Sequence, residues 1–584
     1  MKELKSLNKY LIKYKSKLLL GFIITIIARI FSLVTPRYIG NSLSTIENYL
    51  TKKELNFFEI KDVLLINIFI IIGTSILSGF FTFLMRQTII NISRYIEFDL
   101  KNEIFWHYQR LTQTFYKKNR TGDLMNRISE DVSKVRMYFG PAIMYSIHTI
   151  TLFIIVISYM FSIAPKLTAY TIIPLPVLSI IIYKLSQIIN VKSTRVQEML
   201  SDLSSFVQEN FNGISILKSY NLEEKTNLNF KKLSSKAYKH NLNLAKVQAW
   251  FFPLMVLLIG LSNLIVLYVG GSQYIEGKIK IGVVAEFIIY VNMLTWPVTI
   301  VGWVTSIIQQ AEASQKRINE FLKENPEIIN GNIQVKEIQG YISFKDVNLI
   351  YSDTKITALE RLSFKVKSGE TLGILGKIGS GKTTILDLIT RLYDPNSGSI
   401  YLDNKNLKNF KLDELRSKIA YVPQNSFLFS ESIEENIKFG KISASKSEIK
   451  KAASYANVNT DIENFTNGYQ TIVGERGLTL SGGQIQRISI ARALIKNTKI
   501  LLLDDCLSSI DTETEKKILS NLIKIGENKT NIIVSHRISS IKHSDKILVI
   551  ENGRIIQKGD HKKLLNEKGY YSELYKKQNT ENQI

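Results

Sequence analysis

Six long apolar stretches lie in the first half of the chain, and no stretch of comparable length follows them. Each has about 20 residues, the number that an α-helix needs to cross the hydrocarbon core of a membrane. A soluble bundle of six buried helices is the alternative, but buried helices rarely need apolar runs of this length. We therefore predict six transmembrane helices. Their expected bounds are 18–39, 62–85, 139–163, 166–185, 250–271 and 281–308.

The first apolar stretch has six lysines ahead of it, an arrangement also found in cleaved signal peptides. Arg29 interrupts this stretch and no small-residue cleavage site is visible, so we interpret it as a retained helix. Lysine and arginine are concentrated in two long connections, residues 86–138 and 186–249. Because cationic loops stay in the cytoplasm, these connections, the N-terminus and everything after the sixth helix are predicted to be cytoplasmic.

The long connections carry helical patterns of their own. In the first, apolar residues recur every three or four positions, so one helical face stays apolar beyond the membrane. We expect the membrane helices to continue into the cytoplasm and to turn back near Gly122 and, in the second connection, near Gly213. The recurring apolar positions are Ile92, Ile96, Leu100, Ile104, Tyr108 and Leu111.

The second half of the chain has a different pattern of apolar and polar residues. A polar stretch at residues 309–339, with Pro326 and Gly331, predicts a linker. From residue 340 onward, short β-branched strands alternate with glycine-containing turns and polar helices, which is typical of an α/β domain. We thus predict an α-helical membrane domain at 1–308, with long cytoplasmic extensions, followed by an α/β domain at 340–584.

The formal net charge of the chain is +24, which suggests nucleic acid as one possible partner. Much of the excess lies beside the predicted membrane spans, where topology and anionic headgroups account for it. We therefore expect membrane lipids as partners and no nucleic acid. The single cysteine, Cys506, excludes an internal disulfide framework and a cysteine zinc cluster, and we expect it to pack as a small core residue.

A glycine-rich loop, Gly-Lys-Ile-Gly-Ser-Gly-Lys-Thr at residues 376–383, follows an apolar strand pattern and precedes a helical one. Such glycines let backbone N–H groups wrap a phosphate, and the helix N-terminus adds positive potential. Lys382 is expected to reach the β- and γ-phosphates, and Thr383 to ligate Mg²⁺. The loop therefore predicts ATP and Mg²⁺ as cofactors of a P-loop domain. The other nucleotide-binding candidates are Gly376, Gly379, Ser380, Gly381 and Thr384.

A second anion site is predicted at Leu-Ser-Gly-Gly-Gln, residues 480–484. Ser481, Gly482, Gly483 and Gln484 open a helical run, so their backbone N–H groups can face a phosphate. One phosphate chain cannot easily occupy two loops that are about a hundred residues apart in one domain. A head-to-tail dimer would resolve this, because the loop of one domain would meet residues 480–484 of the other.

An aspartate pair, Asp504 and Asp505, closes the apolar run at residues 500–503. P-loop ATPases hold Mg²⁺ with a carboxylate at the end of such a strand. Asp504 is therefore a candidate metal ligand. Asp505 occupies the position of the hydrolytic carboxylate, but it is one methylene shorter than the glutamate expected there.

In this order, the motifs resemble those of the ATP-binding cassette (ABC) exporters in which six transmembrane helices are fused to one nucleotide-binding domain. The resemblance covers nearly the whole chain. It implies that Tyr351 stacks on adenine, that Gln424 touches Mg²⁺ and couples to the membrane domain, and that His536 contacts the γ-phosphate. It also implies that Asp511, in the loop 508–511, lies at the interface between two cassettes.

Several short segments resemble one branch of this family in particular. Residues 471–477 resemble the exporter-specific loop that faces the membrane domain, and the turns at Gly122 and Gly213 match the coupling helices of the family. Residues 115–125 and 293–297 are most similar to bacterial multidrug-type half-transporters. The resemblance thus implies a multi-pass protein of the cytoplasmic (inner) membrane of a bacterium, which works with a second half-transporter.

Members of that branch often pair as two different chains, one with aspartate at the hydrolytic position and one with glutamate. Aspartate retracts its oxygens by about 1.5 Å, and displacing a catalytic group by about 1 Å can lower a rate some hundredfold. We therefore expect a slow site at Asp505 and favour a heterodimer. In a homodimer, a shift of the backbone or a bridging water would have to restore the activity.

The sequence hardly specifies the transported molecule. Arg29 and Glu286 lie within apolar stretches, where a charge suggests a functional site, although Glu286 is near the start of its span and a solvated position is equally expected. We expect alternating-access export of a hydrophobic, amphipathic or drug-like small molecule. A lipid or lipid-A-type flippase, and a channel-gating or regulatory cassette ATPase, are the alternatives. Aromatic residues that either line a cavity or pack are Tyr145, Tyr159, Tyr290 and Trp303.

Overall fold

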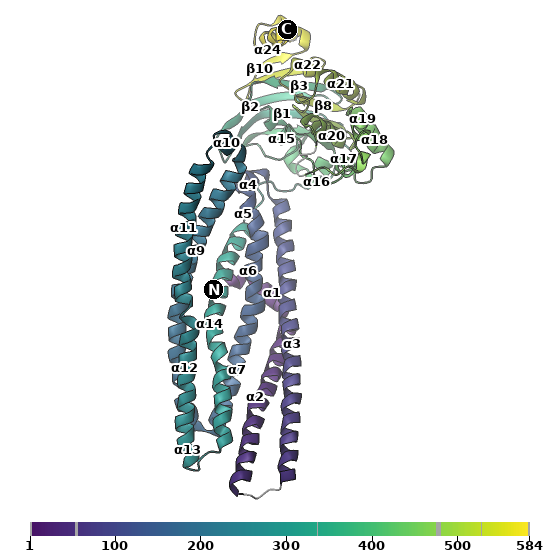
Figure 1. The fold of residues 1–584 in the computed structure, drawn as a ribbon. Coiled ribbons are helices and arrows are strands. Elements are labelled where there is room, and N and C mark those ends of the chain that lie inside the picture. Colours follow the sequence, from purple (N-terminus) through teal and green to yellow (C-terminus); the bar gives the residue numbers. More distant parts are fainter. Residues whose placement is uncertain (1–2, 53–56, 336, 475–479, 527, 582–584) are drawn as a thin grey trace. The chain divides into compact units, whose positions relative to one another are not determined.

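The computed structural model describes residues 3–52, 57–335, 337–474, 480–526 and 528–581. The chain divides into two compact units, which can be followed by colour in Figure 1. The first unit contains Met1–Gln109 and Gly122–Glu324, and the second contains Arg110–Thr121 and Asn325–Ile584. The tip of the first cytoplasmic connection therefore belongs to the second unit, together with the α/β domain.

The first unit is a bundle of long helices (Figure 1). Helix α9 packs along α11 and α12, whereas α14 packs along α2 and α7. The helices are α1 (Asn8–Lys13), α2 (Lys15–Lys52), α3 (Phe57–Arg110), α5 (Thr121–Asn126), α6 (Val132–Met137), α7 (Ile143–Ile163), α8 (Pro165–Ile172), α9 (Pro174–Asn212), α10 (Ile214–Ser219), α11 (Glu223–Gln248), α12 (Phe251–Ile265), α13 (Gly271–Ile275) and α14 (Ile281–Leu322).

Several of these helices are much longer than a membrane requires. Helix α3 has 54 residues and α9 has 39. The predicted apolar face of α3 is the reason for its length, because Ile92, Ile96 and Leu100 are all buried beyond the apolar stretch. Helix α14 likewise continues to Leu322, so the first part of the expected linker at 309–339 is helical.

Among the described residues, five helices are long and apolar enough to cross a membrane. They contain the expected spans one, two, three, five and six. The expected fourth span, 166–185, is divided between α8 and α9 at Ile173. Pro174 directly follows the division, and a proline has no N–H with which to continue the helical hydrogen bonds. Five of the six expected spans are thus found among the described helices that are long and apolar enough, and the fourth is not.

Close packing joins α2 to α14. A Cβ atom on Gly282 would lie 1.9 Å from the carbonyl oxygen of Gly40, so the two backbones approach too closely for any side chain. One turn further on, Glu286 is buried and accepts a hydrogen bond of 2.8 Å from the hydroxyl of Tyr290. Glu286 is therefore not in a solvated position, because the close approach of α2 and α14 covers it.

The aromatic candidates of the membrane helices pack against one another. The rings of Tyr159 and Tyr290 meet edge to face with centroids 5.8 Å apart, and those of Tyr145 and Trp303 with centroids 5.6 Å apart. Tyr290 is fully buried. These aromatic residues were expected either to line a cavity or to pack, and the two contacts are packing contacts.

The second unit contains two sheets. The larger has the order β10-β9-β3-β8-β7-β6, and the smaller, antiparallel sheet has the order β2-β1-β4-β5. The strands are β1 (Ile342–Ile350), β2 (Thr357–Val366), β3 (Thr371–Gly376), β4 (Ser397–Leu402), β5 (Lys405–Asn406), β6 (Ile419–Val422), β7 (Ile500–Asp504), β8 (Thr530–Val534), β9 (Lys546–Glu551) and β10 (Arg554–Gly559).

Among the described residues, the two largest apolar cores of this unit support these sheets. One lies between the sheets around α15, and the other joins β6 and β7 to the helices α17, α18, α20 and α21. Cys506 is buried in the second core, as expected for a packing residue. The helices of this unit are α4 (Gln113–Lys118), α15 (Lys382–Ile389), α16 (Leu412–Ser417), α17 (Ile433–Lys438), α18 (Lys446–Tyr455), α19 (Asn459–Glu463), α20 (Gly482–Leu494), α21 (Thr512–Gly526), α22 (Ile538–Ile541), α23 (His561–Asn566) and α24 (Tyr570–Glu581).

Candidate nucleotide site

Four of the predicted motifs meet at one edge of the larger sheet. Strands β6, β7, β8 and β3 are parallel neighbours, so their carboxyl ends lie side by side. The glycine-rich loop follows β3 and His536 follows β8. Asp504 ends β7, and Gln424 follows β6. The sheet thus gathers residues that are up to about 160 positions apart in the sequence.

The glycine-rich loop is held tightly against neighbouring strands. Gly381 has a φ of +95°, and a Cβ atom there would lie 2.3 Å from the carbonyl oxygen of Ala358. At Gly376, a Cβ atom would lie 2.2 Å from the carbonyl oxygen of Ile550. Both positions therefore need glycine, and the loop delivers the chain directly into the N-terminus of α15 at Lys382.

Lys382 is the cation of this loop, and it is buried. Its Nζ atom donates to the carbonyl oxygens of Gly376, at 2.9 Å, and Lys377, at 2.7 Å. Burial lowers the pKa of Lys382, while the charges of Asp505 and Asp504 act in the opposite direction. The ammonium group is thus held inside the curve of the loop, where a phosphate would complete its contacts.

Thr383 and Asp504 form the candidate metal site. The Thr383 hydroxyl donates to Oδ1 of Asp504 at 3.1 Å. Asp504 is 1% exposed, and its Oδ2 atom has no hydrogen-bond partner among the described residues. Burial raises the pKa of this carboxyl. A buried carboxylate oxygen without a donor, beside a hydroxyl oxygen, fits Mg²⁺, and the ion would supply positive charge to bound phosphates.

Gln424, the other expected metal contact, lies at the same sheet edge but is exposed. None of the hydrogen bonds described for the structure joins it to Thr383 or Asp504. Ser380, within the loop, also has a buried hydroxyl without a partner among the described residues. The unpaired Ser380 hydroxyl suits a phosphate oxygen, and the unpaired oxygen of Asp504 suits a metal ion.

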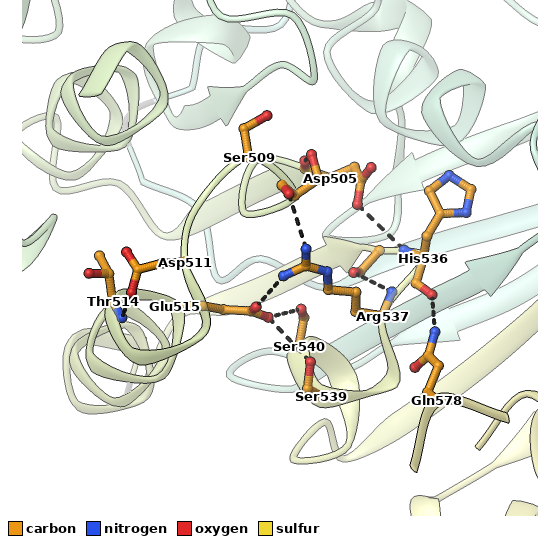
Figure 2. A network of polar contacts seen from close by, with 12 residues as sticks. Asp505, Ser509, Asp511, Thr514, Glu515, His536, Arg537, Ser539, Ser540 and Gln578 are labelled. Carbon is orange, nitrogen blue, oxygen red and sulfur yellow. Dashed lines mark hydrogen bonds and ion pairs between the residues drawn. The ribbon is translucent and has the colours of Figure 1, made fainter. Parts of the chain in front are cut away.

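Asp505 and His536 face each other across the ends of β7 and β8 (Figure 2). The backbone N–H of His536 donates to Oδ1 of Asp505 at 3.4 Å. Asp505 has a φ of +42°, a left-handed conformation that aspartate tolerates better than most residues. Burial raises its pKa, although His536 and Lys382 lower it. Burial also lowers the pKa of His536, which favours the neutral imidazole.

An ion pair between the buried Glu515 and the half-exposed Arg537, beside this site, was not among the sequence candidates (Figure 2). Nη1 of Arg537 donates to Oε2 of Glu515 at 2.8 Å, and Nη2 donates to the carbonyl oxygen of Ser508 at 3.2 Å. The hydroxyl of Ser540 donates to Oε1 of Glu515 at 2.6 Å. Arg537 directly follows His536 in the sequence, but an isolated glutamate in the first turn of α21 gives no signal of its partner.

Residues 481–484 form the N-terminus of α20. The hydroxyl of Ser481 accepts from the N–H of Gln484 at 3.3 Å, and Oε1 of Gln484 accepts from the N–H of Ser481 at 3.0 Å. This reciprocal cap fixes the start of the helix. A Cβ atom on Gly482 would meet nothing within 4 Å, so the space beside it is open. None of the hydrogen bonds or ion pairs described for the structure joins these four residues to the glycine-rich loop.

Tyr351 lies beside the start of α15. Its hydroxyl is 2.9 Å from that of Thr384, and its ring meets Tyr393 edge to face at 5.3 Å. The ammonium of Lys117, in the segment 110–121, lies 5.1 Å from the centroid of the Tyr351 ring. The structure thus brings Tyr351 to the nucleotide-binding candidates and places a residue of the cytoplasmic connection on its ring.

The remaining candidates are Asp511 and the expected exporter-specific loop. Oδ1 of Asp511 accepts from the N–H of Thr514 at 2.9 Å and so caps α21. The expected exporter-specific loop, residues 471–477, reaches beyond the described residues at 475–479. Its described part pairs with the cassette, because Ile433 donates its N–H to the carbonyl oxygen of Thr471.

Comparison with known families identifies both units. Residues 18–298 match the model of the ABC transporter transmembrane region, and residues 359–508 match the model of the ABC transporter. A multidrug resistance-like ATP-binding protein, MdlA of Buchnera aphidicola (subsp. Schizaphis graminum), is 34% identical over 100% of both chains. The chain belongs to the ABC transporter family.

Other relatives of the transporter have similar names. The probable multidrug resistance ABC transporter protein YheI of Bacillus subtilis is 33% identical and covers 98% of this chain and 97% of its own. MdlA of Escherichia coli is 34% identical over 87% of both chains. A bacterial Atm1-family ABC exporter with ATP bound superposes with a TM-score of 0.81 at 23% identity, over 97% of this chain and 99% of its own. That likeness shows the exporter fold.

Proposed function

We propose that this transporter exports amphipathic or drug-like small molecules across the cytoplasmic membrane of a bacterium, driven by ATP hydrolysis. The observation that carries the proposal is the fusion of membrane helices with a cassette whose phosphate loop, Asp504 and His536 share one sheet edge. The multidrug-resistance names of the relatives support this class of substrate.

The transporter works as a dimer of half-transporters. In one chain, the N-terminus of α20 has an open side at Gly482 and makes no described bond to the phosphate loop. A second cassette placed head to tail would bring the two together around ATP. The tip of the second cytoplasmic connection also leaves large apolar side chains exposed, including Phe211 at 70% and Tyr220 at 73%. Exposed apolar tips of this kind suit docking on another subunit.

Alternating access would follow from the joining of the two cassettes. ATP with Mg²⁺ would join the two cassettes through the loop, Lys382 and Thr383 of one and Ser481 of the other. Closure of the cassettes would move the cytoplasmic turns, and hydrolysis would reset them. The shortened carboxylate of Asp505 makes a slow site, so we favour a partner chain that supplies a glutamate at the matching position.

Transport by reconstituted protein tests the proposal. In inside-out vesicles, the wild-type transporter should accumulate fluorescent amphipathic dyes when ATP is added, and Lys382→Ala should abolish accumulation. Lys377→Ala is the matched control, because Lys377 lies in the same loop but its ammonium is exposed and bonds Glu551 at 2.7 Å. Full-rate transport by Lys382→Ala would refute ATP-driven export by this subunit. ATP-dependent movement of labelled lipid alone would favour a flippase, and ion current without hydrolysis a channel regulator.

A further inference from the structure

Arg29 lies deep in the first membrane span. It follows the start of the apolar stretch at residue 18 by 11 positions, which is about 17 Å along an α-helix. The hydrocarbon core of a bilayer is about 30 Å thick, so this guanidinium lies within it. A charge at that depth is unfavourable unless it is paired or lines a polar cavity.

The neighbours of Arg29 leave its charge uncompensated. Nη2 donates to the hydroxyl of Thr82 at 3.3 Å, and Nε is buried without a hydrogen-bond partner among the described residues. Within the part of the chain that the structure describes, no carboxylate oxygen lies within 4.0 Å of it. His148 of α7 is close enough to interact electrostatically, but it offers no negative charge. The unpaired Nε atom and the missing anion both point to a ligand.

Thr82 also lines a hollow of 470 Å³ along α3. Its lining residues recur at intervals of three and four, so they occupy one helical face. Arg86 presents an exposed guanidinium one turn beyond Thr82, and no acidic residue contributes to the lining. The hollow thus combines positive charge and hydrogen-bond donors with apolar walls. Its lining residues are Gly79, Thr82, Phe83, Arg86, Gln87, Ile90 and Asn91.

We propose that Arg29, Thr82 and Arg86 bind the anionic group of an amphipathic substrate, whose apolar part lies against Phe83 and Ile90. This inference rests on the proposed export function and narrows its substrate class to amphipathic anions. Guanidinium groups bind carboxylate, sulfonate and phosphate oxygens through two parallel hydrogen bonds. The headgroup of an anionic lipid and a free amphipathic anion share this chemistry.

Tetraphenylborate and tetraphenylphosphonium are matched probes, because they have the same shape and opposite charges. The complete transporter is placed in nanodiscs of neutral lipid, and probe binding and stimulation of ATPase are measured. We expect half-saturation by tetraphenylborate at a lower concentration than by tetraphenylphosphonium. Arg29→Gln should raise the tetraphenylborate concentration at half-saturation about tenfold or more, because a charged hydrogen-bonding partner is lost. The response to tetraphenylphosphonium should not weaken.

Further variants test the site even if Arg29→Gln does not fold. Arg86 is exposed, so Arg86→Gln should fold normally and should also weaken tetraphenylborate selectively. Arg29→Lys keeps the charge but loses the planar fork, and its effect should be intermediate. Arg37→Gln is the matched control, because it removes an exposed arginine from the same helix and should change neither probe. Equal binding of both probes by wild type, or an equal shift of both by Arg29→Gln, would overturn the site.

A second measurement distinguishes the headgroup of an anionic lipid from a free amphipathic anion. ATP-dependent translocation of fluorescent phosphatidylglycerol, but not of phosphatidylcholine, with loss in Arg29→Gln, would identify a lipid headgroup. Tetraphenylborate stimulation without lipid translocation would identify a free amphipathic anion. If no anionic, cationic or neutral probe is moved by ATP, the proposed export function fails. The binding measurements test the site separately, because they need no transport.

Discussion

At the scale of single residues, Asp505 is held in an unusual way. Its backbone is left-handed, its N–H donates to the carbonyl oxygen of Val534 at 2.9 Å, and its carboxylate accepts from the N–H of His536. The short side chain is therefore tied to the backbone at the end of β8. A longer side chain at this position would keep the bond from the backbone N–H to Val534 and extend its oxygens further.

Asp505→Glu should raise the ATPase rate of the purified chain. The added methylene extends the carboxylate by about 1.5 Å, and general-base positioning contributes about 10² to 10⁴ to a rate. We expect a gain of at least about tenfold. Asp505→Asn is the control, because it keeps the length and removes the charge, and it should show no gain. A chain that already hydrolyses ATP at a normal exporter rate, with no gain from glutamate, would contradict the slow-site proposal.

We expect Asp387 to make the stability of the cassette depend on pH. Burial, and secondarily the charge of Asp504, raises the pKa of Asp387 to about 6, while Lys117 lowers it. Because this pKa is above the ordinary value of 3.8, the folded state favours the protonated form. Its stabilising contribution is therefore complete below pH 3.8 and is lost as the pH rises through about 6.

Asp387→Asn should flatten this part of the pH profile. The difference between wild type and variant in the free energy of unfolding should change by at most about 3 kcal/mol between pH 4 and pH 7. Thermal unfolding of the detergent-solubilised transporter across this range measures it. Asp353→Asn, at an exposed position, is the control and should leave the profile unchanged. The same slope in wild type and Asp387→Asn would exclude Asp387 as its source.

At the scale of elements, the cytoplasmic segment 110–121 is joined to the cassette through Lys117. Its ammonium lies 5.1 Å from the ring centroid of Tyr351 and 5.3 Å from that of Tyr393. The hydroxyl of Thr112 adds a hydrogen bond of 3.4 Å to Glu327. The segment that leaves the membrane helices therefore contacts the residue expected to stack on adenine.

Lys117→Ala should weaken communication between substrate and ATPase. Two cation–π contacts contribute on the order of 1 to 2 kcal/mol together. We expect the ratio of substrate-stimulated to basal ATPase to fall several-fold, because the segment is held less firmly. Lys118→Ala removes the next lysine, which has no described ring contact, and should keep the ratio. An unchanged ratio in Lys117→Ala would show that the segment is held by other contacts.

Some of these features can be predicted from the sequence and others cannot. Apolar length locates the membrane helices, and glycine spacing locates the phosphate loop, because both depend on residues close together in the chain. The division at Ile173 is also local, because it comes directly before Pro174, whereas the burial of Glu286 depends on the approach of α2 to α14. The pairing of Arg537 with Glu515 is equally invisible, since strand order brings α21 beside the end of β8.

At the scale of the whole molecule, we propose that a single chain holds two halves of an ATP site, because no described bond joins the phosphate loop to the start of α20. The phosphate loop is complete, with Lys382 and Thr383 in place. The start of α20 is also complete, because Ser481 and Gln484 cap each other, and its open side is at Gly482. In the proposed dimer, each half would therefore be preformed before the two chains meet.

Mixing two inactive variants of this chain tests that arrangement and the choice of partner. Lys382→Ala removes the loop function, and Gly482→Asp puts a negative charge on the open side of α20 without a clash inside its own cassette. In a homodimer, random pairing makes half of the dimers mixed, each with one intact site, so about a quarter of the wild-type activity should return. If the chain works only with a different partner, the mixture should stay inactive. Co-expressed with that partner, Lys382→Ala should lose the site at this chain's own phosphate loop. Gly482→Asp should lose the site at the partner's phosphate loop. Activity in either variant alone would contradict the shared site.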